Sequence, residues 1–507
     1  MVRSGICVNA IEFLELNWHN QWMRNSIILY INNELHEIDA KNSMLSVANY
    51  LRYKVNLTGT KIVCSEGDCG ACTVILARFN GDRLGSYQTI NSCISFIYLL
   101  DKCHIITVEG LSTNKGLHPV QASMMKHHGA QCGFCTPGVV CSLASMSEDV
   151  KKFKKTITKK KVKNYLTGNL CRCTGYEPII AAGEHTEIDK VVGFSDRYNH
   201  AQMIHKFKSL NNLDVNLVSD THEVYIPSSY KNLFSQNMIA NTQITAGATD
   251  LGVMINKGKG TPSKITSLSG IIDAYKILNN ESGLIIGARA SLTDVEKSCK
   301  KDFSEFSYKL KIFASPQIKN KGTLVGNLVN ASPVGDTIPF LIVAGAIVII
   351  QNSQRSRRVP VALFFKGGYK QIDLQQDEIV THIIVPKNQL KFKLYKVSTR
   401  KDLDISTVSM AISYILENDK FSKFKITFGG VGPTVMQIKS VENEIIGKAL
   451  TPQLYKKLAK LIDAEITPLS DLRGTEKYRR TLCHNLFLKF CDEVMAIIDR
   501  KKIEVSL

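Results

Sequence analysis

The sequence has no hydrophobic stretch long enough to span a membrane. Its longest apolar run, at 338–350, contains Pro339 and Gly345 and is shorter than the roughly 20 residues that a transmembrane helix needs. It also lacks an N-terminal stretch in which a basic segment, an apolar segment and a small-residue cleavage site follow one another. We therefore expect a cytoplasmic protein that has no membrane partner.

Motifs for nucleic-acid recognition are also missing, although the charge is strongly positive. The chain has 64 Lys and Arg against 45 Asp and Glu, a formal net charge of +19, and eight of the thirteen residues at 151–163 are lysine. This run has no arginine and a single aromatic residue, Phe153. It favours a solvated connector or a partner-facing surface over a nucleic-acid site. A DNA- or RNA-associated iron–sulfur protein is the weaker alternative.

Length and composition indicate a globular protein of several domains. A chain of 507 residues is too long for one ordinary core and suggests about three domains. The hydrophobic content of 44% and charged content of 21% exclude a disordered chain. The fourteen cysteines lie largely in metal-like motifs of a long chain, which indicates a reducing compartment and not a disulfide framework.

The most informative motif is the run Cys-Ser-Glu-Gly-Asp-Cys-Gly-Ala-Cys at 64–72, with a further cysteine about twenty residues later. The spacing C-x₄-C-x₂-C…C is that of a plant-type [2Fe–2S] cluster. Gly67 and Gly70 let a short loop turn its sulfurs toward one centre, because glycine tolerates positive φ. Zinc favours paired C-x₂-C elements, and no second pair completes one here. The motif predicts a cluster ligated by Cys64, Cys69, Cys72 and Cys93.

A second group of cysteines lies in a stretch that we expect to be helical. Gln-Cys-Gly-Phe-Cys-Thr-Pro-Gly at 131–138 holds one C-x₂-C element, and Leu-Cys-Arg-Cys-Thr-Gly-Tyr at 170–176 holds one C-x-C element. A Cys₄ zinc site is chemically possible, but C-x-C suits tetrahedral zinc poorly, so a second [2Fe–2S] cluster is favoured. Its ligands would be Cys132, Cys135, Cys171 and Cys173. The other cysteines have no metal spacing and are expected to be ordinary thiols: Cys7, Cys103, Cys141, Cys299, Cys483 and Cys491.

The segment at 244–252, Ile-Thr-Ala-Gly-Ala-Thr-Asp-Leu-Gly, predicts a strand that runs into a glycine-containing turn. Consecutive N–H groups in such a turn can hold phosphate oxygens, although many loops have the same pattern. It is not a Rossmann fingerprint, because G-x-G-x-x-G after a strand is missing.

The two cysteine motifs together resemble those of the molybdenum hydroxylases, the family of xanthine dehydrogenases and aldehyde oxidases. The turn at 247–251, together with Gly-Thr-Leu-Val-Gly-Asn at 322–327 and Ser-Pro-Val-Gly-Asp at 332–336, resembles the FAD-binding loops of that family. One departure is Val325, where the family usually has a glycine. The segments at 395–405, 428–433 and 473–482 continue the resemblance, which covers roughly residues 26–495. It implies FAD contacts at Gly247, Ala248, Thr249, Asp250, Leu251, Gly326, Asn327, Ser332, Asp336 and Lys396.

The fold class that the resemblance implies is multidomain α+β. We expect a β-grasp plant-type ferredoxin domain at 26–106, an all-helical [2Fe–2S] domain at 107–183, a linker at 184–222, an FAD-binding domain at 223–385 and a C-terminal α/β subdomain at 386–498. Within the first domain, the sequence predicts strands at 27–31 and 34–38 and a helix at 43–51.

The resemblance implies that the chain is an electron-transfer subunit of a xanthine dehydrogenase. It would carry the iron–sulfur clusters and FAD, without the family's molybdopterin-binding portion. We expect substrate oxidation, and every catalytic residue for it, on a molybdopterin-binding partner subunit. Electrons from hypoxanthine or xanthine would pass through two [2Fe–2S] clusters to FAD and then to NAD⁺. Gln131 stands where the family's glutamine reaches the pterin cofactor. The expected assembly is a heterotetramer made of two heterodimers. The alternative is the corresponding subunit of an aldehyde oxidase or N-heterocycle hydroxylase.

Overall fold

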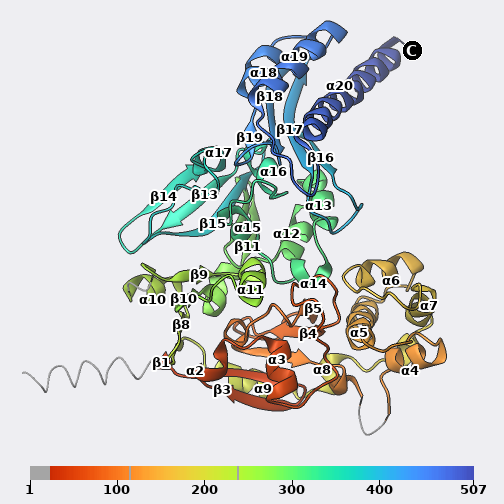
Figure 1. Cartoon of the computed structure of the whole chain (residues 1–507), viewed down its shortest axis with the longest axis vertical. Helices are drawn as coiled ribbons and strands as arrows, with labels where there is room; N and C mark the ends of the chain where they lie inside the picture. The colour runs from red at the N-terminus through yellow and green to blue at the C-terminus, as the bar shows by residue number, and fades with distance from the viewer. Residues whose placement is uncertain (1–22, 113–115, 237–238, 507) are drawn as a thin grey trace, which may run out of the picture. The chain divides into compact units, whose positions relative to one another are not determined.

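The computed structural model describes residues 23–112, 116–236 and 239–506 and has a multidomain α+β architecture (Figure 1). It divides into two compact units. Described residues up to Asp273, together with Ser315–Gly322, form unit 1, and Ala274–Ala314 with the residues from Thr323 onward form unit 2. The predicted FAD-binding domain at 223–385 therefore contributes to both units. In the described ranges, no helix is both long and apolar enough to cross a membrane.

Unit 1 begins with a five-stranded mixed sheet in the order β3-β2-β6-β4-β5. The predicted hairpin is confirmed: β2 and β3 pair antiparallel around Asn32, which has a φ of 56°. The predicted helix at 43–51 is confirmed only from Val47, because the Ser46 side chain accepts a hydrogen bond from the Asn49 N–H and starts the helix there. The elements are β2 (Ile27–Ile31), β3 (Glu34–Ile38), α2 (Ala40–Ser43), α3 (Val47–Tyr53), β4 (Thr73–Arg78), β5 (Gln88–Asn91) and β6 (Cys103–Ile106).

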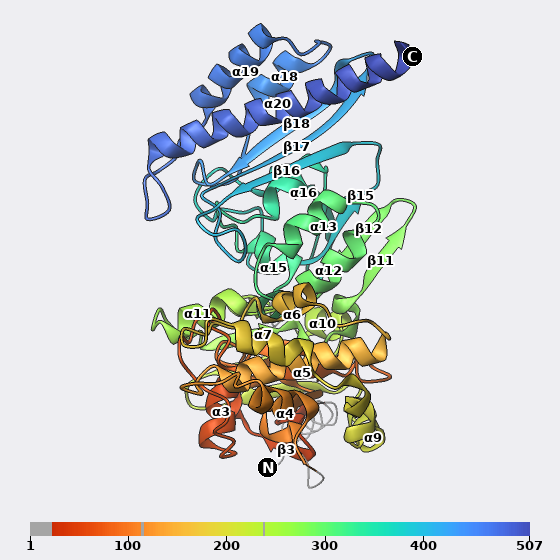
Figure 2. The same cartoon turned by 90° about the vertical axis from the view of Figure 1, so that its right-hand side faces the viewer.

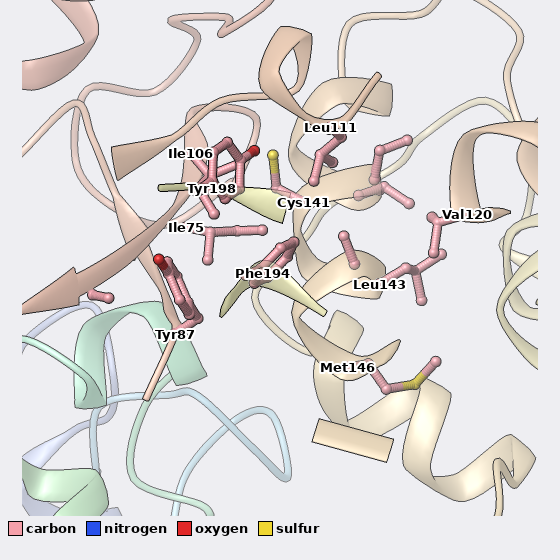
Figure 3. Close-up of a cluster of buried hydrophobic side chains, with 14 of the residues drawn as sticks. Ile75, Tyr87, Ile106, Leu111, Val120, Cys141, Leu143, Met146, Phe194 and Tyr198 are labelled. Carbon is pink, nitrogen blue, oxygen red and sulfur yellow. The ribbon is translucent and has the colours of Figure 1, made fainter. Parts of the chain in front are cut away.

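A group of four helices follows and packs against this sheet. His118 caps the first of them, as the His-Pro-Val-Gln sequence predicts. The longest, α5, contacts β4 and β5, and Figure 3 shows Ile75 and Ile106 of the sheet in the same buried cluster as Cys141 and Leu143 of α5. The helices are α4 (Pro119–Lys126), α5 (Thr136–Lys152), α6 (Lys159–Leu166) and α7 (Glu177–Glu184).

The segment at 184–222 is folded, contrary to our expectation of a linker. It forms α8 (Phe194–Arg197), α9 (His200–Lys208) and β7 (Asp214–Val218). Phe194 and Tyr198 are buried in the core that the sheet and α5 share (Figure 3), and Phe207 is buried in the same core. Three buried aromatic side chains supply enough apolar surface to dock a segment that is polar on average.

The remainder of unit 1 is a second five-stranded sheet in the order β1-β7-β8-β10-β9. Its edge strand, Met23–Arg24 (β1), pairs with β7. The sequence of β1 has no alternation of apolar and polar residues that would predict a strand. An ion pair of 2.6 Å between Arg24 and Asp101 also ties this strand to the first sheet. The other elements are β8 (Glu223–Ile226), α10 (Tyr230–Ser235), β9 (Gln243–Thr245), α11 (Thr249–Asn256), β10 (Lys264–Ser267) and α14 (Pro316–Lys319), which packs on β5.

Unit 2 contains an antiparallel sheet in the order β11-β12-β15-β13-β14. Helix α15 packs against β15 in this unit. The strands are β11 (Ile277–Asn280), β12 (Gly283–Gly287), β13 (Ile347–Gln351), β14 (Ser356–Pro360) and β15 (Ile379–Pro386). The helices are α12 (Leu292–Cys299), α13 (Ser304–Lys311), α15 (Leu324–Val329), α16 (Ile338–Val343) and α17 (Val361–Phe364).

The last part of unit 2 pairs β16 (Lys391–Val397), β17 (Val408–Glu417), β18 (Lys420–Gly429) and β19 (Met436–Gln437) in one antiparallel sheet. The subdomain predicted as α/β therefore has only antiparallel strand pairs among its described residues. Successive strands are joined by connections too short for a parallel crossover, such as the turn at Asn418 and Asp419. Figure 2 shows the long α20 (Glu476–Ser506) beside this sheet, together with α18 (Lys439–Ile445) and α19 (Pro452–Glu465).

Candidate iron–sulfur and flavin sites

The loop at 64–72 is shaped by residues in the left-handed region. Ser65, Gly67 and Gly70 have φ values of 57°, 76° and 69°. A Cβ on Gly67 would lie 2.5 Å from Ile94 Cδ1, so a larger residue would have no room there. The backbone N–H groups of Glu66 and Cys69 donate to Cys64 Sγ at 3.4 and 3.5 Å, as N–H groups around cluster sulfurs do.

The sulfurs of the first quartet are in mutual contact. Hydrogen bonds from the Cys69 and Cys93 thiols are the main reason why the pKa of Cys64 is lowered. A hydrogen bond from Cys93 likewise lowers the pKa of the buried Cys72. The same contacts raise the pKa of Cys69 and Cys93, so the four sulfurs lie close enough to share protons; metal binding would deprotonate them, because the thiolate is the form of cysteine that binds metal. The predicted residues Cys64, Cys69, Cys72 and Cys93 therefore lie together, and their donor set fits a [2Fe–2S] cluster.

The second quartet lies where α5 begins, with the C-x-C element beside it. The C-x₂-C and C-x-C elements meet in two sulfur contacts. Cys173 donates to Cys132 across a sulfur–sulfur distance of 3.5 Å, and Cys135 and Cys171 are also hydrogen-bonded to each other. This pairwise arrangement suits a cluster in which two irons share four thiolates. Cys132 and Cys173 are exposed, whereas Cys171 is buried.

The surroundings of the second quartet also suit sulfur ligands. Burial acts to raise the pKa of Cys171, but hydrogen bonds from Thr174, Cys173 and Cys135 outweigh burial and lower it. The hydroxyl of Thr136, next to Cys135, is buried and has no hydrogen-bond partner among the described residues. A sulfide or thiolate of a bound cluster would give this hydroxyl an acceptor.

The two quartets are joined by one short backbone contact. The Leu170 N–H, next to Cys171, donates to the carbonyl of Cys69 at 2.9 Å. The two ligand-bearing chain segments are therefore in direct contact. The sequence could not predict this contact, because about a hundred residues separate its partners.

Gln131 stands at the outer edge of the second quartet. Its side chain is exposed, as are those of Cys132 and Phe134. An exposed amide offers both a donor and an acceptor to a partner, which is the role that the resemblance implies for it.

The predicted phosphate turn in unit 1 has the backbone shape that such a turn needs. A Cβ on Gly247 would lie 2.2 Å from the Lys321 carbonyl, so this position requires glycine. Ala248 has a φ of 54°, and α11 begins directly after it at Thr249. The N–H groups of Thr249, Asp250 and Leu251 in the first turn of α11 are available to an anion, as at other helix N-termini.

The remaining predicted flavin residues lie in unit 2. Asn327 Oδ1 accepts a hydrogen bond of 2.6 Å from Thr337, and Gly326 and Ser332 lie close to it in sequence on and after α15. Lys396 forms a buried ion pair of 2.5 Å with Asp336, and its ammonium also donates to the Asp404 carbonyl. Lys396 therefore holds Asp336 in place, and its contribution to a flavin site is indirect.

Val325, the departure from the family pattern, is 4% exposed on α15. Its side chain is accommodated by packing within unit 2, where α15 contacts β15. The substitution is therefore compatible with the fold of this segment.

Sequence reasoning missed three amide side chains around the clusters. Asn256, on α11, donates to the Ser65 and Cys93 carbonyls at 2.8 and 2.9 Å. Asn169 and Gln317 are buried between the two cysteine loops. Asn169 directly precedes the Leu-Cys-Arg-Cys motif, so its position in the sequence could have indicated a role near the cysteines. Nothing in the sequence around Gln317 indicates such a role.

Three regions of the chain match known protein families. Residues 107–184 match the [2Fe-2S] binding domain, residues 219–388 the FAD binding domain in molybdopterin dehydrogenase, and residues 393–494 the CO dehydrogenase flavoprotein C-terminal domain. A [2Fe–2S]-binding domain and an FAD-binding domain are therefore present, as the sequence predicts.

Curated relatives include two xanthine dehydrogenases. That of Emericella nidulans is 26% identical over 562 residues, which cover 98% of this chain and 40% of the relative. That of Blastobotrys adeninivorans is 28% identical over 586 residues, which cover 95% of this chain and 41% of the relative. The chain thus spans about two fifths of the length of these relatives.

A solved structure shares the fold of part of the chain. It is a carbon monoxide dehydrogenase from Hydrogenophaga pseudoflava that lacks the Mo-pyranopterin moiety of the molybdenum cofactor. The match has a TM-score of 0.50 and 22% identity, and it covers 54% of this chain and 96% of that one.

Proposed function

We propose that this chain belongs to the molybdenum hydroxylase family and is the electron-transfer component of a xanthine dehydrogenase. The three matched domains support the family. Both curated relatives described above are xanthine dehydrogenases, and this supports the choice of substrate. The oxidation of hypoxanthine or xanthine would take place on a molybdopterin-binding partner subunit. The assembly would be a heterotetramer, and NAD⁺ would be the final acceptor.

The observation that carries this proposal is the contact between the two cysteine quartets. Cys64, Cys69, Cys72 and Cys93 form one complete set of thiol ligands, and Cys132, Cys135, Cys171 and Cys173 form another. The hydrogen bond from the Leu170 N–H to the Cys69 carbonyl joins the two loops. Ligand loops in direct contact would keep two one-electron centres close enough to exchange electrons, whereas two independent structural sites need no such contact.

When bound, the clusters would carry single electrons, and FAD would convert them into a hydride for NAD⁺. The chain's own residues would position these groups. The turn at 247–251 would hold phosphate oxygens with its N–H groups, and Gly326, Asn327, Ser332 and Asp336 would line the flavin, with Lys396 fixing Asp336. Gln131 would reach the pterin of the partner subunit with its exposed amide.

The proposal is tested on purified full-length chain with and without its partner. We expect about four irons, in two [2Fe–2S] clusters, one FAD per chain, and NADH-dependent reduction of artificial acceptors. The isolated chain should not oxidise xanthine, and the complex should form NADH from NAD⁺ when xanthine is added. Zinc in place of half of the iron would overturn the second cluster, and xanthine oxidation by partner-free chain would overturn the subunit assignment.

A further inference from the structure

Three glycines bring the two cysteine loops into backbone contact. Gly70 follows Cys69 directly, Gly138 lies three residues after Cys135, and Gly168 lies three residues before Cys171. A Cβ on Gly70 would lie 2.0 Å from the Gly168 carbonyl oxygen, and a Cβ on Gly138 would lie 2.1 Å from the Gly70 carbonyl oxygen. The loops therefore approach as closely as backbone allows, and side chains elsewhere must hold them in register.

Buried polar side chains surround this glycine junction. Asn169 is 1% exposed; its Nδ2 donates to the Gly70 carbonyl at 3.0 Å, and its Oδ1 accepts from the Ser142 hydroxyl at 2.7 Å. The Thr73 hydroxyl donates to the same Gly70 carbonyl at 2.6 Å. Asn169 comes from the second cysteine motif and Thr73 from the strand after Cys72, so the network links both loops.

Gln317 enters this network from a distant part of the sequence. It is 1% exposed, and its Nε2 donates to Asn169 Oδ1 at 3.1 Å and to Thr73 Oγ1 at 3.2 Å. The orientation of the amide follows from its partner. Because Asn169 Nδ2 is committed to the Gly70 carbonyl, Asn169 presents its oxygen to Gln317, and this oxygen needs a donor.

The rest of α14 lies on the first cysteine loop. Ile318 packs against the buried cluster that contains Cys72, Cys93 and Ile94, and Asn320 donates to the Thr89 carbonyl at 2.8 Å. One short helix therefore contacts the first loop with Ile318 and the junction of both loops with Gln317. It directly precedes the predicted flavin loop that begins at Gly322.

We propose that Gln317 is a positioning residue that fixes the separation and relative orientation of the two cluster-binding loops. This inference rests on the proposed function, because it requires both quartets to hold clusters. A side chain with the length of glutamine but no N–H would leave Asn169 Oδ1 with one donor fewer. The loops would then keep their own ligands but lose a restraint on the Cys69–Leu170 contact.

The test measures the magnetic interaction between the two clusters in chain reduced with dithionite, with neither partner nor substrate present. We compare the parent with Gln317→Met and with Asn320→Ala, a control change at the residue that caps the same helix, which leaves the junction intact. Iron content should stay at the parent value in both variants. The spin–spin splitting at low temperature should change in Gln317→Met and stay at its parent value in Asn320→Ala. If Gln317→Met kept the iron content of the parent and also its spin–spin splitting, the proposal would be overturned.

Gln317→Glu provides a second measurement should Gln317→Met lose iron. A protonated carboxyl can donate to Asn169 Oδ1, whereas a carboxylate cannot. The splitting in this variant should therefore approach that of the parent at low pH and depart from it as pH rises. Parent splitting at every pH would overturn the role of Gln317. A parent chain that holds fewer than two clusters would instead overturn the proposed function itself, so the two failures are distinguishable.

Discussion

The two cysteine quartets offer the same ligands in opposite surroundings. In the first, Cys72 and Cys93 are buried, and Asn256 holds the loop by hydrogen bonds to the Ser65 and Cys93 carbonyls. In the second, Cys132 and Cys173 are exposed at the start of α5. Two large apolar side chains beside them, Phe134 and Leu170, are 55% and 49% exposed.

This difference indicates the direction in which each site faces. The first quartet has no fully exposed cysteine, whereas the second has two, so a centre held by the second is the better placed to meet another protein. Exposed apolar side chains grouped at one place are typical of interaction sites. We therefore expect the partner subunit to cover Gln131, Phe134 and Leu170, and the following predictions test this contrast in order of decreasing effect.

The largest effect is expected from removing one ligand of each quartet. Cys135→Ser should lose the helical-domain cluster, and with it about half of the iron, while the ferredoxin-type signal remains. Cys72→Ser should lose the other cluster, while the helical-domain signal remains. Iron analysis and electron paramagnetic resonance measure these effects.

Cys141→Ser is the control for this pair. Cys141 is buried on α5 and belongs to neither quartet, so the change should lower stability and leave all of the iron in place. Loss of iron from Cys141→Ser equal to that from Cys135→Ser would mean that cluster content reports folding and not ligation.

Gln131→Ala should slow xanthine-to-NAD⁺ turnover in the assembled enzyme and leave the chain's own reduction by NADH unchanged. Loss of a buried hydrogen bond at the interface would cost about 1–3 kcal/mol. Stopped-flow kinetics and pterin analysis measure the two steps. Equal turnover and equal pterin content in mutant and parent complexes would mean that Gln131 only packs within its own loop and does not contact the pterin.

Oxidative loss should distinguish the two clusters without any mutation. In air with a chelator, the isolated chain should lose its helical-domain signal first, because Cys132 and Cys173 are exposed, while Cys72 and Cys93 are buried. Addition of the partner subunit should slow this loss, if it covers the exposed face. Simultaneous decay of both signals would contradict the contrast in accessibility.

The sequence predicts well which cysteines lie together and poorly which other residues connect them. Cysteine spacing is local, so both quartets, the hairpin at 27–38 and the start of α4 at His118 followed from short motifs. The contacts of Gln317, Asn256 and Leu170 bring together segments far apart in the chain and depend on the tertiary fold. The segment at 184–222 was misjudged because a few aromatic anchors, such as Phe194, outweigh its polar composition.

The smallest effect concerns the pH dependence of the ferredoxin-like core. His104 Nε2 lies 2.7 Å from the Asn32 carbonyl and donates to it, so the neutral ring accepts at Nδ1 from the Tyr87 hydroxyl at 2.6 Å. Burial lowers the pKa of His104 to about 3, whereas an unfolded histidine titrates near 6.5. The unfolded state therefore binds a proton more readily. The stability that the neutral ring provides is complete above about pH 6.5 and falls as pH drops toward the folded pKa, by about 1.4 kcal/mol per pH unit.

His104→Gln should flatten this dependence, because glutamine does not titrate. Urea unfolding at pH 7, 6 and 5, followed by circular dichroism, gives the slopes. His200 also faces Tyr87, at 2.7 Å, and burial lowers its pKa as well, so His200→Gln is needed beside it to separate the two contributions. The exposed His128 supplies the control. If His104→Gln kept the parent slope while His200→Gln removed it, the acid sensitivity of this core would belong to His200.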